Sequence, residues 1–355
     1  TAVYPGTLES SPSDEVEATP APASSTTVSS DITVDTVWSA SGSPYTVTGS
    51  IQVQSGVTLT IEPGVEIRFD TGHLEVLGIL QARGTAIFPI TFRSNAASPV
   101  LGDWTGIRLI GSETDDSLLE YCRIEHAATG IYIRDASPEI AYSEIIGQHV
   151  NVDYVDYFGI YLLRSNAHIH HCNISYFVNE GNYWTRAIYM QESSPIVEYN
   201  DILDNEYGIH IYYGGTPQIL HNRIEDFRYS GIYCNGEYRS ANAPFPTINN
   251  NIIQTIYKSS DTWNLHVRRY AVNSGTTDPS LIIDARNNYW GTDDPAEVAA
   301  SIHQWPRYTL ADPSVDFRGF LDGPDGSPVP GHFIPAGKLP SDELNWTAAS
   351  GPYIV

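Results

Sequence analysis

Short runs in which apolar and polar residues alternate occur along most of the chain. Examples are TGIYIR (129–134), FGIYLL (158–163) and YGIHIY (207–212). Alternation with a period of two is typical of β-strands, and Gly, Asn and Pro separate the runs as turn residues do. The pattern therefore predicts an all-β protein built from many short strands.

These runs recur as copies of one longer phrase. SPIVEYNDILDNEYGIHI begins at Ser194 and TPQILHNRIEDFRYSGIY at Thr216, with Asn222 in the place that Asn200 has in the first copy. Further copies of the second half are TGIRLI (105–110), RAIYMQ (186–191), SGIYCN (230–235) and a degenerate copy at 264–268. One such unit is too small to bury its own apolar face, whereas stacked neighbours bury it together. The repeat therefore predicts a solenoid whose equivalent strands pair in parallel, a parallel β-helix.

The phrase PxIxxNxI followed by GIxI resembles the repeat of the right-handed parallel β-helix family, which includes pectate lyases and the repeat domains of carbohydrate-binding and sugar-hydrolase proteins. The segment ARNNYWGTDDP (285–295) is similar to the closing segment common in that family, and residues 46–110 are similar to its opening coils. The resemblance covers about residues 32–321 and implies a right-handed parallel β-helix. It implies no single activity, because one fold carries many functions.

The composition of the two ends differs from that of the repeats. Residues 1–31 are rich in Pro, Ser, Thr and acid and predict an extended N-terminal arm, whereas residues 322–355 predict a loop-rich tail. The β-helix is assigned to 32–321, with a capping segment at 285–321. Within this cap, Asp294 and Pro295 predict the start of one short helix near 295–304, with Val298, Ile302 and Trp305 at helical spacing.

Charge and hydropathy limit the partners of the chain. It has 355 residues with 42 acidic and 18 basic side chains, a formal charge of −24, which argues against nucleic acid and anionic membranes. No apolar run reaches the roughly 20 residues of a membrane span. The sequence begins at Thr1 and carries sequons at Asn173 and Asn345. We expect an extracellular or cell-surface protein whose signal peptide has been removed.

One polar column predicts a side-chain ladder at a turn of every coil. Aligning the copies brings Cys122 and Cys172 two coils apart, roughly 10 Å at the usual strand spacing, which exceeds disulfide reach. These two residues and Cys234 are therefore predicted to be buried free thiols. Asparagine side chains in such a column stack and bond along the solenoid axis. The column comprises Cys122, Ser143, Cys172, Asn200, Asn222, Asn251 and Asn287.

A second column is mostly aromatic. In the second half of each copy, the residue after the Gly-Ile pair points outward if the isoleucine points inward. An exposed ring can cover the apolar face of a sugar while neighbouring polar groups bond its hydroxyls. The same rings also stabilise any parallel sheet, so both interpretations stay open. The column comprises Arg108, Tyr132, Tyr161, Tyr189, His210, Tyr233 and His266.

Three connections are longer than the others and are expected to form a wall beside this column. They are the segments 147–158, 176–186 and 255–263. A wall of acids and aromatic rings could border a polysaccharide cleft, and it could equally form a contact surface. Its candidate residues are Asp153, Tyr154, Asp156, Tyr157, Glu180, Tyr183, Trp184, Asp261 and Trp263.

Complete catalytic and metal-binding signatures are missing from the sequence. Arg134, Arg164 and Arg268 are candidate bases of a lyase, but no trio of acids accompanies them. The histidines at 168, 170, 171 and 221 are expected to be satisfied by neighbours and not to ligate a metal. No cofactor is required by any motif, although the excess of carboxylates is compatible with Ca²⁺.

Two classes of function remain. In the first, the chain is a secreted structural or adhesive surface protein that assembles with other copies of itself through its arm, for which Ile32–Val34 has the alternation of an added strand. In the second, it binds or cleaves an extracellular polysaccharide, as a lyase or glycoside hydrolase, with the aromatic column. The missing catalytic signature favours the first narrowly.

Overall fold

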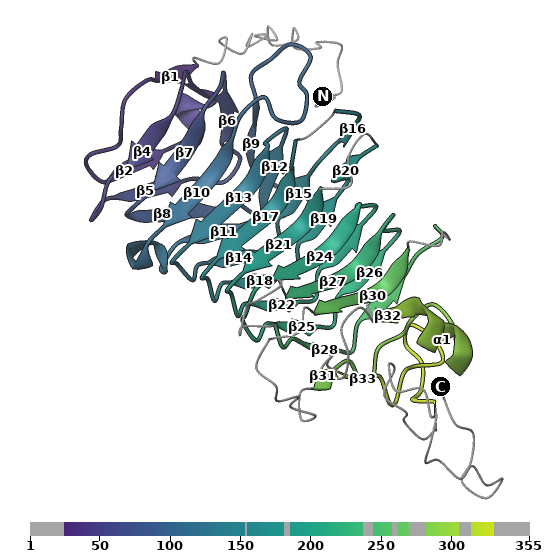
Figure 1. The fold of residues 1–355 in the computed structure, drawn as a ribbon. Helices are drawn as coiled ribbons and strands as arrows, with labels where there is room; N and C mark the ends of the chain where they lie inside the picture. The colour runs from purple at the N-terminus through teal and green to yellow at the C-terminus, as the bar shows by residue number, and fades with distance from the viewer. Residues whose placement is uncertain are drawn as a thin grey trace, which may run out of the picture.

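The chain forms a right-handed parallel β-helix, as the repeat and the resemblance predict. The computed structural model describes residues 25–152, 155–180, 185–236, 244–257, 262–269, 282–304 and 314–329. Successive coils stack along one axis from the N-terminal to the C-terminal end, and their strands pair in parallel in three long sheets (Figure 1). The described residues include one α-helix, at the C-terminal end of the stack.

Sheet A has ten strands among the described residues. They are β1 (Thr26–Val28), β3 (Tyr45–Val47), β6 (Glu66–Phe69), β9 (Ile90–Ser94), β12 (Cys122–Glu125), β15 (Glu144–Ile146), β19 (Asn173–Ser175), β23 (Asp201–Leu203), β26 (Arg223–Glu225) and β29 (Ile252–Gln254). Two short 3₁₀ turns, η1 (Ala40–Gly42) and η2 (Ser112–Thr114), lie in connections between strands.

Sheet B, which carries the aromatic column, also has ten strands in the described part of the chain. They are β4 (Ile51–Val53), β7 (His73–Val76), β10 (Gly106–Ile110), β13 (Thr129–Arg134), β17 (Phe158–Leu163), β21 (Arg186–Gln191), β24 (Tyr207–Tyr212), β27 (Ser230–Gly236), β30 (Trp263–Arg269) and β32 (Ile302–Gln304). The degenerate copy at 264–268 is therefore a regular strand, β30, which pairs in register with β27.

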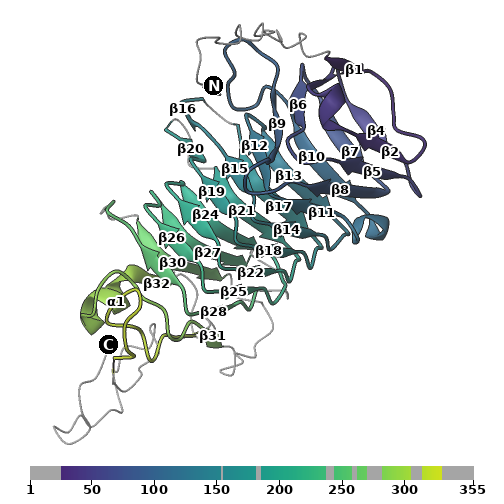
Figure 2. The same cartoon turned by 180° about the vertical axis from the view of Figure 1, so that it is seen from behind.

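Sheet C has eleven strands within the described ranges. They are β2 (Thr36–Trp38), β5 (Thr58–Ile61), β8 (Ile79–Arg83), β11 (Leu118–Glu120), β14 (Glu139–Ala141), β18 (His168–His170), β22 (Ile196–Glu198), β25 (Gln218–Leu220), β28 (Thr247–Asn249), β31 (Ile282–Asp284) and β33 (Ser314–Asp316). A further parallel pair, β16 (His149–Val150) and β20 (Val178–Asn179), projects beside β15 and β19 in two opposite views (Figures 1 and 2).

The core consists of columns of isoleucine, which explains the repeat. Ile202 pairs with Ile224 in sheet A, and Ile209 pairs with Ile232 in sheet B. All four side chains are buried. Because a parallel strand places equivalent residues of adjacent coils beside each other, one inward isoleucine per strand produces a continuous apolar column. Each copy of the phrase is thus one coil of the core.

The predicted polar ladder runs along the turn between sheets C and A. Asn200 donates to the side-chain oxygen of Asn222, and Asn222 donates in the same way to Asn251. The prediction was wrong for the last member: Asn251 donates to Asn288 and not to Asn287. The turn before the ladder has a left-handed residue in each coil, and Asn287, with φ of 58°, occupies that exposed position.

The three cysteines are buried free thiols, as predicted. Cys122 and Cys172 occupy ladder positions at the start of the column, where backbone N–H groups donate to the side chains of Ser143 and Asn200, respectively. Burial raises the pKa of Cys172 to about 12, and it raises that of Cys122 further above the ordinary range of a thiol. Cys234 lies in β27 and is equally buried.

The N-terminal end of the stack begins earlier than the composition predicts. Strand β1 begins at Thr26 and pairs with β3, so sheet A starts within the segment assigned to the arm. Ile32 forms a parallel bridge with Val53 of the same chain. The alternation of Ile32–Val34 therefore serves an internal pairing at the edge of sheet B. Residues 1–24 of the arm lie outside the described residues.

The C-terminal helix is shorter than predicted. Helix α1 spans Pro295–Ser301, and the side chain of Asp294 accepts hydrogen bonds from the N–H groups of Ala296 and Glu297, which confirms the predicted cap. Ile302, placed in the helix by its spacing from Val298, instead begins β32 and pairs with Leu265. The open edge of sheet B offers backbone hydrogen bonds, and the chain takes them in place of another helical turn. Trp305 lies outside the described residues.

Candidate functional site

The aromatic column exists as a register of paired residues on sheet B. Tyr132 pairs with Tyr161, Tyr161 with Tyr189, and Tyr189 with His210. The column continues at both ends: Arg108 pairs with Tyr132 and Glu75, and Tyr233 pairs with His210 and His266. The side chain of His266 lies outside the described part of the structure.

The column is not uniformly exposed. Tyr132, Tyr161 and Tyr189 are half-buried, whereas His210 retains 2% and Tyr233 retains 5% of its accessible surface. A partner that approaches sheet B can therefore contact the first part of the column, from Arg108 to Tyr189, and not the rings of the second part. Alternation of inward and outward residues predicts the direction of a side chain but not what covers it.

The three accessible tyrosines form a herringbone. The ring centroids of Tyr132 and Tyr161 are 5.1 Å apart at an interplanar angle of 85°, and those of Tyr161 and Tyr189 are 4.8 Å apart, also at 85°. Each ring is thus nearly perpendicular to the ring of the next coil. Arg108 places its guanidinium 5.0 Å from the centroid of the Tyr132 ring.

A buried polar cluster at the end of the accessible column centres on Arg186. Its Nε donates to Nδ1 of His210 at 2.9 Å, and its guanidinium lies 5.2 Å from the Tyr189 ring centroid and 5.8 Å from that of Tyr207. Asp156 is the carboxylate beside it, with 3.7 Å between Oδ1 and Nη1. Burial lowers the pKa of Arg186, and the negative charge of Asp156 opposes that shift. Cation–π contacts and one histidine acceptor compensate for its removal from water.

Glu206 is the second buried charged residue of this region. Its carboxylate accepts hydrogen bonds from the hydroxyl of Thr185 at 2.9 Å and from the backbone N–H of Asn179 at 3.3 Å. Burial raises the pKa of Glu206 to about 7, although both hydrogen bonds and the positive charges of Arg228 and Arg186 oppose the rise. Sequence reasoning missed Arg186 and Glu206, because neither follows the Gly-Ile pair.

The predicted loop wall is only partly described. Asp156 is exposed beside Arg186, and Glu180 is exposed with Oε1 3.5 Å from Nη1 of Arg228. Tyr157 is buried in the apolar core and is not available as a wall residue. Trp263 is the first residue of β30, and nothing further is described of its side chain. Asp153, Tyr154, Tyr183, Trp184 and Asp261 lie outside the described residues.

Two of the three candidate lyase arginines, Arg134 and Arg164, form ion pairs with Asp135. Arg164 forms two hydrogen bonds with Asp135, at 2.6 and 2.9 Å, and Nε of Arg134 lies 3.8 Å from the same carboxylate. The side chain of Arg268 lies outside the described residues. In the described ranges, no group of three or more His, Cys, Asp and Glu side chains could hold a metal ion.

A second aromatic column, which the sequence analysis missed, lies on the opposite side of the coil. It occupies the left-handed turn position before the asparagine ladder, where Tyr142, with φ of 49°, and Tyr199, with φ of 55°, are exposed. Its rings stack face to face, with centroid separations from 4.7 to 5.3 Å. In contrast to the herringbone, each inner ring of this outer stack has both faces covered. Its members are Tyr121, Tyr142, His171, Tyr199 and His221.

The histidines of the AHIHHC segment have protein partners, as expected. Nε2 of His168 lies 2.9 Å from Oε1 of Glu198, and Nε2 of His170 lies 3.0 Å from Oε1 of Glu139. His171 and His221 belong to the outer stack, each against a face of Tyr199. Each of these four histidines thus has a partner within the protein.

Comparisons with known proteins agree with the fold. The sequence model of the family described as right-handed β-helix region matches residues 105–269. The sequence model of the pectate-lyase-like β-helix domain family matches residues 30–145. The chain therefore belongs to the right-handed parallel β-helix proteins. Neither the curated proteins nor the solved structures gave a match. No helix of the described residues is long and apolar enough to cross a membrane.

Proposed function

We propose that this protein is an extracellular polysaccharide-binding β-helix that holds a neutral glycan chain along sheet B. The observation that carries the proposal is the in-register column of Tyr132, Tyr161 and Tyr189, half-buried and spaced by one coil. A glycan chain is itself a linear repeat, so that a row of rings spaced by one coil can contact it at regular intervals along its length. Ring faces cover the apolar faces of sugars, and nearby polar groups take the hydroxyls.

The polar groups required for orientation lie next to the rings. Arg134 and Gln191 belong to the outward column beside the tyrosines, and Arg108 precedes Tyr132 in the tyrosine column itself. Tyr161 already donates to Gln191 at 3.4 Å. The Arg186 cluster lies beneath the far end of the accessible tyrosines and holds Tyr189 in place through its cation–π contact. This arrangement supports binding.

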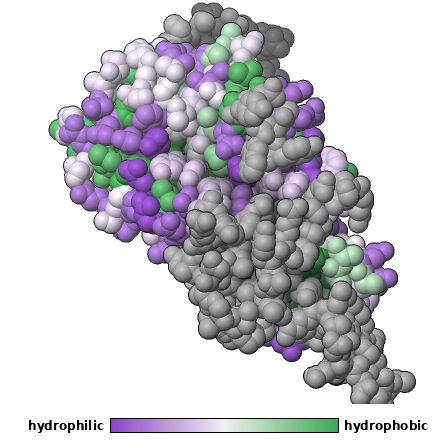
Figure 3. Space-filling model, viewed as in Figure 1, coloured by the Kyte–Doolittle hydropathy of each residue, from purple (hydrophilic) through white to green (hydrophobic). Residues whose placement is uncertain are grey.

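The charge of the molecule favours a neutral polymer. At a formal charge of −24, the protein repels polyanions at long range. On the face of the molecule drawn in Figure 3, the described surface of the N-terminal coils is mainly hydrophilic, and its hydrophobic patches are separate from one another. A hydrated surface with a few aromatic rings suits a sugar polymer better than a large apolar protein interface.

A retention assay on insoluble and soluble neutral polysaccharides tests the proposal. The double substitution Tyr161→Ala and Tyr189→Ala should weaken retention by about tenfold or more, because two stacking contacts are removed. The matched control is Tyr142→Asn with Tyr199→Asn, which removes two rings from the outer stack and should leave retention unchanged. If both double variants bind as the wild type does, or if only anionic polymers bind, the sheet B proposal fails.

Self-association remains the second candidate, supported by a different observation. Strand β2 is the last strand of sheet C at the N-terminal end of the described stack; Val37 within it and Val34 just before it are exposed. Edge strands with exposed apolar side chains pair readily with other chains. Electron microscopy and sedimentation of the full chain, of a variant lacking residues 1–24, and of Val37→Lys test this candidate. Assemblies that are lost in the latter two variants would support it, whereas monomers throughout would reject it.

A further inference from the structure

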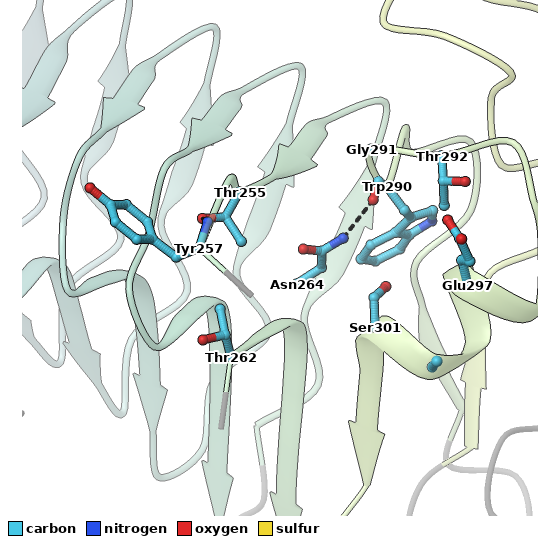
Figure 4. Close-up of a pocket in the computed structure, with 10 residues that line it drawn as sticks. Thr255, Tyr257, Thr262, Asn264, Trp290, Gly291, Thr292, Glu297 and Ser301 are labelled. Atoms are coloured by element: carbon cyan, nitrogen blue, oxygen red, sulfur yellow. Dashed lines mark hydrogen bonds between the residues drawn. The ribbon is translucent and has the colours of Figure 1, made fainter. Parts of the chain in front are cut away.

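A pocket of about 330 Å³ lies at the C-terminal end of the coil stack, between sheet B and α1 (Figure 4). It is separate from the tyrosine column: its walls come from the turn after β29, the start of β30, the segment at Trp290 and one face of α1. A volume near 300 Å³ lies at the lower end of the range of small-molecule sites. The pocket therefore suits a single small ligand and not a polymer.

Asn264 gives this end of the stack a polar wall that other coils lack. It lies opposite Gly231 in the register of β27 and β30, at a position that is Gly or Ala in the preceding coils. A Cβ at Gly231 would lie 2.8 Å from Cγ2 of Ile253 and 2.9 Å from the Phe227 ring, so that only a very small residue fits inside the stack. In β30, at the end of the stack, the equivalent position has room for a larger side chain, and Asn264 takes the place that Gly231 has in β27.

The orientation of this amide is fixed by one hydrogen bond. Nδ2 of Asn264 donates to the backbone oxygen of Trp290 at 2.6 Å. As a result, the side-chain oxygen of Asn264 points away from Trp290, toward Thr255 and Thr262 on the other wall (Figure 4). An acceptor held in this way is preorganised for a ligand that donates hydrogen bonds.

Trp290 supplies a hydrogen-bond donor, in contrast to the acceptor of Asn264. The residue retains 2% of its accessible surface, and its Nε1 has no hydrogen-bond partner among the described residues. In Figure 4 this nitrogen lies on the side of Thr292 and Glu297, which also line the pocket. A buried donor without an acceptor is costly, because it has given up its hydrogen bonds to water. A ligand oxygen placed between the indole N–H and the Glu297 carboxylate would accept from the first and donate to the second.

The hydroxyls of Thr255 and Ser301 are further acceptors. They donate to the backbone oxygens of Phe227 and Val298, respectively. The Thr255 oxygen also accepts from the N–H of Tyr257, which leaves it one lone pair for a ligand, whereas the Ser301 oxygen keeps two. The pocket thus offers several acceptors, the indole N–H as a donor, an aromatic ring, and in Tyr257 and Thr292 two hydroxyls that can donate or accept. A simple cation would satisfy Glu297 but leave the indole N–H without an acceptor, and a carboxylate or phosphate would be repelled by Glu297. A polyhydroxylated ring satisfies all of these groups.

We propose that this pocket binds one neutral sugar residue in the hexose class. The site is independent of the polysaccharide face on sheet B, because the two share no residue. Ala300 lines the pocket from an exposed position of α1, whereas Ala296 is an exposed position of the same helix that does not line it. Substitution by phenylalanine at these two positions gives a blocking variant and its matched control.

The test is calorimetric titration and ligand-observed NMR of the full chain with the methyl glycosides of glucose, galactose and mannose. At least one glycoside should bind, Ala300→Phe should weaken it by about tenfold or more, and Ala296→Phe should leave it unchanged. Glu297→Gln should weaken binding several-fold, because a charge-assisted hydrogen bond becomes a neutral one. Binding should persist in the Tyr161→Ala and Tyr189→Ala variant, which separates this site from sheet B.

Two results would overturn the proposal. If no glycoside binds at millimolar concentration, the pocket holds only water. If a glycoside binds but Ala300→Phe has no effect while the fold is retained, as judged by circular dichroism, the ligand lies elsewhere. Binding of a tetrasaccharide without binding of any single glycoside would likewise reject the assignment to one sugar residue.

Discussion

The side-chain oxygen of Asn222 accepts two hydrogen bonds from Asn200, one from the backbone N–H at 3.0 Å and one from Nδ2 at 2.9 Å. Asn222 in turn donates from Nδ2 to the backbone oxygen of Val197 at 2.8 Å, and it bonds to Asn251 as Asn200 bonds to Asn222. Both asparagines are buried. The ladder therefore ties each coil to the next at the same turn and satisfies backbone groups that the turn leaves unpaired.

Substitution of Asn222 by Ala tests how much this ladder contributes to stability. The backbone N–H and Nδ2 of Asn200 would lose their acceptor inside the protein, and the expected loss of unfolding free energy is about 2–5 kcal/mol. Urea unfolding followed by circular dichroism measures it. Asn250→Gly is the control, since Asn250 is exposed at φ of 59°, where glycine is tolerated. Equal stability of Asn222→Ala and the control would mean that the ladder is incidental.

The fold was predictable because each coil repeats the same local pattern. Inward isoleucines such as Ile202 and Ile224 predict both strand type and register, since a parallel solenoid places equivalent positions side by side. The ladder followed from the same alignment up to Asn251. The prediction failed at the cap, where the repeat ends: Ile302 has helical spacing from Val298, yet it pairs with Leu265. There, a long-range strand edge outweighs the local periodicity.

The cysteines predict a clear reactivity pattern. Because burial raises the pKa of Cys172 to about 12, and raises those of Cys122 and Cys234 further, almost no thiolate is present near pH 8. The native protein should react negligibly with a thiol reagent over minutes, and the denatured protein should release three equivalents. One equivalent in denaturant would instead reveal a disulfide. Rapid reaction of the native chain would show that the coils open locally.

Glu206 predicts a pH dependence of stability. Burial raises its pKa from the ordinary value of 4.5 to about 7 in the folded protein. The folded state therefore binds the proton more tightly, and the stability associated with this group is present below pH 4.5 and is lost as the pH rises through 7. Glu206→Gln keeps an oxygen acceptor for Thr185 and removes this loss. The variant should be more stable than the wild type at pH 8, by about 2–3 kcal/mol, and equally stable at pH 4.

Thermal unfolding at both pH values measures the difference, with Asp116→Asn as the control. Asp116 is an exposed acid in the connection before β11, so its substitution should shift the melting temperature little at either pH. A Glu206→Gln variant that is less stable at pH 8 would mean that the charged carboxylate is stabilised by Arg186 and Arg228 more strongly than burial destabilises it.

The candidate site was less predictable than the fold, for physical reasons. Alternation predicted that Tyr161, Tyr189 and His210 lie in one outward column, and the register of their strands confirms this. It could not reveal that His210 is covered, because the covering groups, such as Tyr207, do not belong to the column. The outer stack did have a signal: the residue before the ladder is Tyr or His in five coils. Tyr and His are not typical of a left-handed turn position, so the stack could be recognised only after the backbone conformation of these residues was known.

Tyr199 provides a direct test of the outer stack. Its ring lies between His171, at 5.3 Å and 19°, and His221, at 4.8 Å and 3°. Tyr199→Asn removes both contacts but keeps a residue that tolerates positive φ, as Asn250 does at the same turn position. The expected loss is about 1–2 kcal/mol of unfolding free energy, since each aromatic pair contributes about 0.5–1.5 kcal/mol. Tyr199→Phe retains the ring and should unfold at nearly the wild-type urea concentration. If Tyr199→Asn also unfolds there, the exposed rings contribute nothing to the stack, and their role would have to be sought in contacts with a partner.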